Sequence, residues 1–328
     1  MKRLLLLLWL LSLALTGCGE PVVSVQGTEP GIPSNAVRTG LGLVGSISGT
    51  MHATPDMPGT AWTDVTMAAV TVDDDGIIRA CAIDGLRCSI PLDATGALQW
   101  EDDAVLSSKN ELADAYGMHK ASTLGTDWYQ QASDLAAWVV GKQVEDLRSG
   151  DVTASVTISP DPLLQAVRQA VESAEHQGAR TGDRLILSVL GDTDGSYSAS
   201  VDLGTNGLAV CTVGAAAVTL RGSTVTSCRF DGVRTRLIVT PQGQVEGDFS
   251  SLQLPFTQQA LDLGLTEEGA FARDWCTQAD TLTTLALGSD VTQLTGSPEA
   301  AACGEPYRLL RKAIDALQVA FQDRGDMV

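Results

Sequence analysis

Histidine is scarce in this chain, and His52, His119 and His176 are the only three among 328 residues. The sequence contains no HExxH zinc helix, no GxSxG nucleophile elbow and no P-loop. No two cysteines have CxxC spacing, and no Cys/His cluster has the spacing of zinc ligands. The adjacent acids at 73–75 fit a hairpin turn better than the alternating ligands of a calcium loop. We therefore predict no metal site and find no catalytic motif.

Basic residues are also few, with 21 Lys and Arg against 40 Asp and Glu, which gives a formal net charge of −19. Phosphate backbones require a basic surface, so this balance argues against nucleic acid as a partner. It also argues against a body that lies flat on anionic lipid. The charge is typical of a soluble, self-repelling surface outside the cell.

Long apolar runs are confined to residues 4–15, which follow a short basic start. This run is too short for a stable transmembrane helix and is typical of a secretory signal. It ends in Leu15-Thr16-Gly17-Cys18, which resembles the bacterial lipobox. We predict a lipoprotein signal peptide over 1–18, acyl chains on Cys18 that hold the protein at a membrane, and a flexible tether over 19–39. The alternative is an ordinary signal peptide with a chance cysteine.

The predicted location is the outer side of the cell membrane, or the periplasm or outer membrane in a Gram-negative cell. Six cysteines remain besides Cys18, an even number that permits disulfides in an exported chain. Cys81 and Cys88 are predicted to pair across a tight bend. Pairing of Cys211 with Cys228 and of Cys276 with Cys303 rests on proximity in the sequence alone. The alternative is that these cysteines are buried free thiols.

A stretch at residues 128–147 returns without gaps at 275–294, an offset of 147 residues (275 − 128). Trp128 aligns with Trp275, and Gly141 aligns with Gly288. Apolar positions recur at the same offset throughout the stretch. A fixed offset that preserves apolar positions and a glycine indicates a duplicated domain.

Each copy has the same succession of expected elements. In the first copy, a strand at 65–72, a turn at 73–76 and a strand at 77–83 form a predicted hairpin. A helix is predicted after Thr126 as its cap, with Asp127 in its first turn and Gly141 as its stop. A second helix is predicted from Asp161-Pro162. The predicted fold is α+β, with two tandem homologous domains at 40–176 and 182–323, each an antiparallel meander packed with helices.

Several segments of the first copy together resemble a group of FMN-binding-like, membrane-anchored lipoproteins of Gram-positive anaerobes. The segments that carry the resemblance are residues 40–47, 68–72, 81–84, 108–112, 116–118, 128–132, 140–142 and 154–158. The second copy matches the group only as a degenerate repeat. The resemblance implies FMN as a candidate cofactor. However, residues 47–54 lack the threonine motif of covalent flavin attachment, and Asp127 opposes an anion at the nearest helix start. We therefore expect no cofactor, with FMN as the alternative.

Polar residues distinguish the two copies. The second copy replaces four polar residues of the first with Phe256, Gln258, Leu263 and Ser289. If either repeat binds a ligand, the first is therefore the better candidate. Its candidate contacts are Lys109, Glu111, Tyr116, His119 and Lys120. The alternative is neutral drift of the second copy.

The predicted function is a lipid-anchored envelope protein that acts as a non-enzymatic binding or interaction module. Its partner is an unidentified protein or small molecule, besides the membrane at Cys18. One alternative is an FMN-binding accessory protein of extracytoplasmic electron transfer. Another is a hydrolase that uses the region of His119, which lies among titratable residues.

Overall fold

The computed structural model describes residues 35–100, 106–152 and 156–325. The predicted signal peptide, Cys18 and most of the predicted tether lie outside these ranges. Within them, no helix combines the length and the apolar character that crossing a bilayer requires.

Two antiparallel sheets form the centre of the fold, each with four strands. The first has the order β3-β2-β1-β8, with β3 (Ile78–Leu92), β2 (Gly59–Val72), β1 (Arg38–Ser46) and β8 (Leu252–Gln253). The second has the order β4-β5-β6-β7, with β4 (Arg184–Asp192), β5 (Gly207–Arg221), β6 (Thr224–Val239) and β7 (Val245–Glu246). A short strand of the second repeat, β8, therefore completes the sheet of the first.

The hairpin predicted around residues 73–76 is confirmed as the turn between β2 and β3. Asp73 Oδ1 accepts hydrogen bonds from the backbone of Asp75 (3.1 Å) and Ile77 (2.8 Å). Gly76 has φ +79°, a conformation that favours glycine. A β-bulge between Thr71 and Val72 then shifts the register of the two strands.

Helices follow the strands in both repeats. In the first they are α1 (Lys109–Leu112), η1 (Ala113–Tyr116), η2 (Met118–Lys120), α2 (Trp128–Val139), η3 (Val144–Asp146), η4 (Ser149–Asp151) and α3 (Pro160–Glu172). In the second they are α4 (Phe256–Asp262), α5 (Glu267–Ala286), α6 (Val291–Thr295), α7 (Pro298–Ala301) and α8 (Gly304–Gly325).

The sequence placed two helix starts slightly wrongly. The cap of α2 is Asp127 rather than Thr126, and the Gln130 side chain accepts a hydrogen bond from the Asp127 backbone (2.9 Å). Helix α3 begins at Pro160 after Ser159, because the proline one position before Asp161 already suits the first turn. The predicted stop of α2 is confirmed, since Gly141 has φ +86°.

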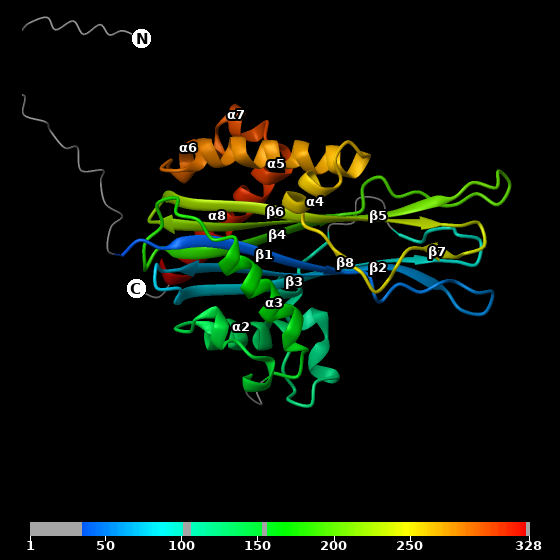
Figure 1. Cartoon of the computed structure of the whole chain (residues 1–328), viewed down its shortest axis with the longest axis horizontal. Coiled ribbons are helices and arrows are strands. Elements are labelled where there is room, and N and C mark those ends of the chain that lie inside the picture. The colour runs from blue at the N-terminus through cyan, green and yellow to red at the C-terminus, as the bar shows by residue number, and fades with distance from the viewer. Residues whose placement is uncertain (1–34, 101–105, 153–155, 326–328) are drawn as a thin grey trace, which may run out of the picture. The chain divides into compact units, whose positions relative to one another are not determined.

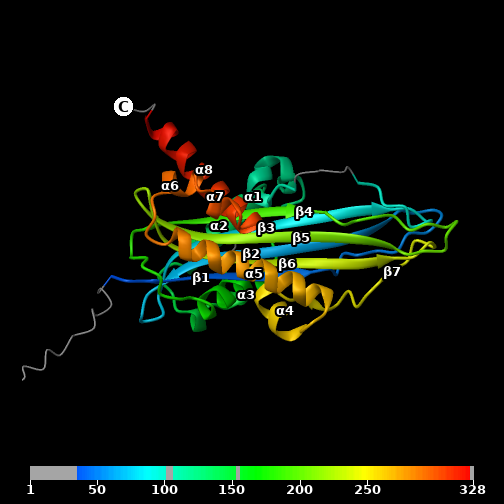
Figure 2. The ribbon, with the colours of Figure 1, turned by 90° about the horizontal axis from the view of Figure 1, so that it is seen from above.

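The two sheets pack face to face, with helices on both outer faces (Figures 1 and 2). The central core lies between the sheets and includes Met67 and Val213. A second core joins the first sheet to α2 and α3, and a third joins the second sheet to α4, α5 and α8. The predicted α+β class, with antiparallel sheets packed with helices, is confirmed.

The same backbone contact occurs within each repeat, at the offset found in the sequence. The backbone N–H of Gly141 donates to Ile78 (2.8 Å), and that of Gly288 donates to Val225 (2.9 Å). Both donors and both acceptors are 147 residues apart. The same strand–helix junction is therefore built twice.

Contacts between the repeats are reciprocal. Ala53 donates a backbone hydrogen bond to Gly243 (2.8 Å), and Ala199 donates one to Gly96 (3.0 Å). Strand β1 packs against β6, and correspondingly β3 packs against β4. Exchange of the two halves thus maps the interface onto itself, as an approximate twofold axis requires.

The predicted pairing of Cys81 with Cys88 is wrong. Both residues lie on the single strand β3 and both are free thiols. Seven residues of extended strand span about 23 Å, whereas disulfide Cα atoms lie within about 7 Å. Cys211 and Cys228 are also far apart. The residue of β5 that lies opposite Cys228 is Val218, whereas Cys211 lies opposite Thr235. Cys276 and Cys303 are also free thiols.

Candidate functional site

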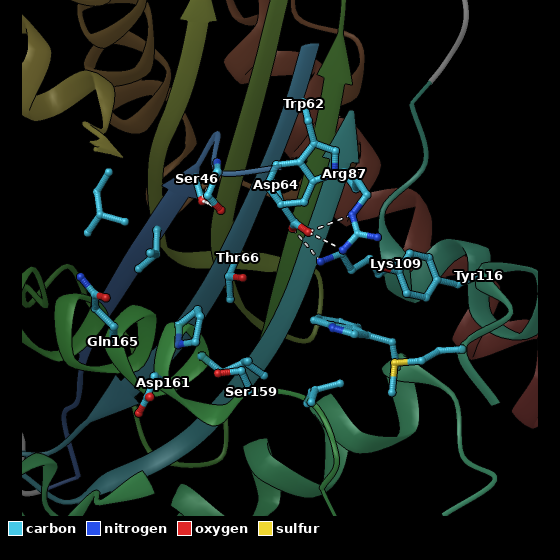
Figure 3. Close-up of a pocket in the computed structure, with 18 residues that line it drawn as sticks. Ser46, Trp62, Asp64, Thr66, Arg87, Lys109, Tyr116, Ser159, Asp161 and Gln165 are labelled. Atoms are coloured by element: carbon cyan, nitrogen blue, oxygen red, sulfur yellow. Dashed lines mark hydrogen bonds and ion pairs between the residues drawn. The ribbon is translucent and has the colours of Figure 1, made fainter. Parts of the chain in front are cut away.

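A cavity of about 470 Å³ lies on the outer face of the first sheet (Figure 3). Strands β1, β2 and β3 form its floor, and residues of α1, η1, α2 and α3 form its walls. Its volume falls within the range of small-molecule sites. The sheet contributes Asp64, Thr66 and Arg87, and the helices contribute both apolar and polar residues, among them Lys109 and Asp161.

Strand alternation selects the floor residues. Trp62, Asp64 and Thr66 are two residues apart on β2, so their side chains share one face of the sheet. Arg87 on β3 lies directly opposite Asp64 in the strand register. The hairpin therefore places an acidic and a basic side chain next to each other beneath the cavity.

Asp64 binds two cations at once (Figure 3). Its Oδ1 accepts a hydrogen bond from Lys109 Nζ at 2.6 Å. Its Oδ2 accepts hydrogen bonds from Arg87 Nη2 (2.8 Å) and Nε (3.0 Å). One carboxylate facing two cations leaves this cluster with one net positive charge, within a chain whose net charge is −19.

Aromatic rings flank both cations. The Arg87 guanidinium lies 5.3 Å from the Trp62 ring centroid and 5.7 Å from that of Tyr116. Lys109 Nζ lies 5.9 Å from the Tyr116 centroid and 5.1 Å from that of Trp128. Each cation is within cation–π range of two rings, and Tyr116 serves both. We call Asp64, Arg87, Lys109 and these three rings the cation cluster.

Lys109 is only 4% exposed, which is unusual for a lysine. Burial lowers the pKa of Lys109, whereas the adjacent Asp64 acts to raise that pKa. Gly85 provides the space, because a Cβ there would lie 3.0 Å from Lys109 Cδ. A side chain at position 85 would therefore crowd the lysine that holds Asp64.

Of the five residues predicted from the sequence to contact a ligand, the structure brings Lys109 and Tyr116 to the cavity. Glu111 does not line it, because its Oε2 accepts from the Ser108 backbone (2.9 Å) and its Oε1 pairs with Lys312. This carboxylate instead completes the cap of α1.

His119 and Lys120 also lie outside the cavity lining. His119 Nδ1 is 2.8 Å from Asp127 Oδ2, and the His119 backbone N–H donates to Asp127 Oδ1 (2.9 Å). The histidine thus braces the start of α2. Lys120 is exposed at the end of η2.

Sequence reasoning missed Trp62, Asp64 and Arg87, and it treated Trp128 only as a core residue. The alternation of Trp62, Asp64 and Thr66 along β2 was a usable signal for one polar face. The partnership of Asp64 with Arg87 was harder to find, because the β-bulge shifts the register expected from the hairpin turn.

In the second repeat, a buried aromatic side chain occupies the position equivalent to that of Lys109. Phe256 stands 147 residues after Lys109, is fully buried, and packs against Trp275 with ring centroids 4.9 Å apart. A Cβ at Gly232 would lie 2.3 Å from the Phe256 ring, as one at Gly85 would crowd Lys109. The two repeats share this geometry, but only the first places a cation there.

The described residues contain no group of three or more His, Cys, Asp or Glu side chains arranged to hold a metal ion. The donors that line the cavity are a guanidinium, an ammonium, hydroxyl groups and the amide of Gln165. Two carboxylates also line it: Asp64 is paired with both cations, and Asp161 accepts a hydrogen bond from the Ser149 hydroxyl. Donors such as the guanidinium and the ammonium complement carboxylate, phosphate or sulfate groups.

The chain matches no family model, no curated protein sequence and no solved structure.

Proposed function

We propose that this protein binds a small acidic organic molecule in the cavity of its first repeat. In this proposal it is a lipid-anchored, extracytoplasmic binding module rather than an enzyme. The observation that carries the proposal is the cation cluster, in which one carboxylate and three rings hold two cations beside a cavity of about 470 Å³.

Arg87 is the group best placed to meet the acid. Its side chain is 44% exposed, and its Nε and Nη2 atoms are engaged by Asp64, which leaves Nη1 for a ligand. The rings of Trp62 and Tyr116 both lie within cation–π range of the Arg87 guanidinium and help to hold this side chain in place. A cation fixed in place before binding loses less entropy when it engages an anion.

Apolar side chains line much of the rest of the cavity, beside polar residues such as Asp161 and Gln165, and they favour a ligand with an apolar or aromatic body. Val44, Met118, Trp128, Ile158 and Leu163 contribute this surface. The ligand class that fits both parts is an organic acid whose ring or chain packs on the apolar wall while its anionic group faces Arg87.

The proposed cellular location of the protein rests on the sequence alone. The signal peptide and the lipobox cysteine Cys18 favour attachment to the outer side of a membrane. The excess of acidic residues accords with a body that stays away from anionic lipid.

FMN is a second candidate, because it combines a phosphate with a flat aromatic ring. The same two features of the cavity favour it, namely the exposed Arg87 guanidinium and the neighbouring rings. Bound flavin would give the visible absorbance bands of a flavin after expression with riboflavin supplied, on the order of one flavin per chain. The hydrolase alternative gains no support from the cavity, since His119 does not line it.

Titration calorimetry with matched ligand pairs tests the proposal. We expect aromatic carboxylates or phosphate monoesters to bind at least about tenfold more tightly than their neutral amides or alcohols, a difference of about 1.4 kcal/mol. The reason is that only the acids engage the fixed cations. Equal affinities for acids and neutral partners, across a panel that includes FMN, would rule out the proposed ligand class.

A further inference from the structure

Four small polar side chains meet in the core between the two sheets. Thr63 and Cys88 are cross-strand partners in the first sheet, and Cys211 and Thr235 are cross-strand partners in the second. The two thiols belong to the central core, and each residue is 2% exposed. The cavity of the first repeat does not include any of the four.

The sheets approach each other closely at this point. Thr63 Oγ1 lies 2.7 Å from Thr235 Oγ1, so two short side chains bridge the gap between the sheets directly. Stacked sheets are usually about 10 Å apart, a spacing that threonine side chains do not span. The backbone at these positions is therefore nearer to the opposite sheet than the usual spacing allows.

The approximate twofold axis relates the threonine contact to the cysteines. In the strand registers Thr66 faces Gly85, and the equivalent Gly214 faces Gly232. Counting three residues along each strand from these pairs makes Thr63 equivalent to Cys211 and Cys88 equivalent to Thr235.

Exchange of the halves thus maps the Thr63–Thr235 contact onto the pair of Cys211 and Cys88. The two thiols must then face each other across the sheets as the two hydroxyls do. In agreement, the neighbouring Cys88 thiol, together with burial, raises the pKa of Cys211 well above its usual range.

We propose that Cys88 and Cys211 form a disulfide that joins the two repeats when the chain folds under oxidising conditions. The two thiols lose two protons and two electrons as the Sγ–Sγ bond forms. A disulfide oxidant such as glutathione disulfide takes up the electrons and protons and is reduced to two thiols. Since both cysteines are buried in the folded chain, the exchange occurs before the sheets close on each other.

The experiment is refolding of the full chain in glutathione redox buffer, followed by denaturation, alkylation without reductant and peptide mapping. We expect one linked pair of peptides carrying Cys88 and Cys211, with alkyl groups on the remaining body cysteines, namely Cys81, Cys228, Cys276 and Cys303. Alkylation of both Cys88 and Cys211 in every oxidised sample would overturn the proposal. So would a link from either residue to a different cysteine.

A melting experiment adds a second readout. We expect the oxidised protein to melt on the order of 5–10 °C above the reduced protein, because the link constrains the unfolded chain. Cys211→Ser should abolish this difference between redox states, and Cys228→Ser, which alters another buried thiol, should preserve it. An undiminished difference in Cys211→Ser would contradict the proposal. If that variant does not fold, the peptide map of the unaltered chain decides.

Discussion

Replacing Asp64 by asparagine is expected to lower the free energy of unfolding by about 3 kcal/mol, because it removes the carboxylate that Lys109 and Arg87 share. The Lys109 side chain is 5% exposed, so its ammonium would stay buried beside an amide or lose its proton at a cost. The first outcome leaves a buried charge without its counter-charge, and the second costs the free energy of deprotonating the amine at neutral pH.

Urea unfolding measured for the two proteins at neutral pH checks this expectation. The matched control is Asp74→Asn, whose carboxylate pairs with His176 but is 63% exposed. Exposed pairs contribute about 0–1 kcal/mol, so the control should unfold close to the original protein. A loss in Asp64→Asn as small as in the control would show that the cation cluster is only a surface ion pair.

Replacing Glu305 by glutamine is expected to stabilise the protein by about 3 kcal/mol at pH 8. Burial, and to a smaller extent the charge of Asp192, raises the pKa of Glu305 to about 7 from an ordinary 4.5. Glutamine keeps an acceptor for Trp275 Nε1, which lies 3.2 Å from Glu305 Oε2, and it carries no charge.

The sign of the effect follows from proton binding. Between pH 4.5 and about 7 the folded chain holds a proton on Glu305 that the unfolded chain has released, so stability falls as pH rises through this window. The advantage of Glu305→Gln should therefore vanish near pH 4 and reach its full size above pH 7. Denaturant unfolding at several pH values measures it, with the exposed Glu246→Gln as control. An advantage that does not change with pH would contradict this explanation.

The sequence predicted those features that depend on local pattern. The hairpin at residues 73–76 follows from Asp73 and Gly76, and the end of α2 follows from Gly141. The repeat predicted that the second copy would share these junctions, as the contacts at Gly141 and Gly288 show. Backbone conformations set by one residue and its neighbours are visible in sequence.

The features that sequence could not reveal depend on packing between distant segments. The strand β8 pairs with β1 across some 200 residues of chain, with Ser46 opposite Leu252. Cysteines that are close in sequence, such as Cys81 and Cys88, lie far apart because an extended strand separates them. Proximity along the chain is therefore a poor guide to disulfide partners when both residues belong to one strand.

The candidate site was predicted in part for a physical reason. Lys109 and Tyr116 stood out because the second repeat replaces them with apolar residues. Asp64 and Arg87 gave no such signal, since their partnership arises only from the strand register after the bulge. Titratable residues near Lys109 in sequence, such as His119, belong to the helix cap instead.

Titration of an aromatic acid into two arginine variants tests the central claim most directly. Arg87 and Arg79 both lie on β3, both have side chains that are 44% exposed, and both pair with an aspartate, but only Arg87 lines the cavity. For an acid that binds the unaltered protein, we expect Arg87→Gln to weaken binding at least about tenfold and Arg79→Gln to leave it unchanged. Unaltered acid binding by Arg87→Gln, or equal weakening by both variants, would contradict a ligand held by the cation cluster.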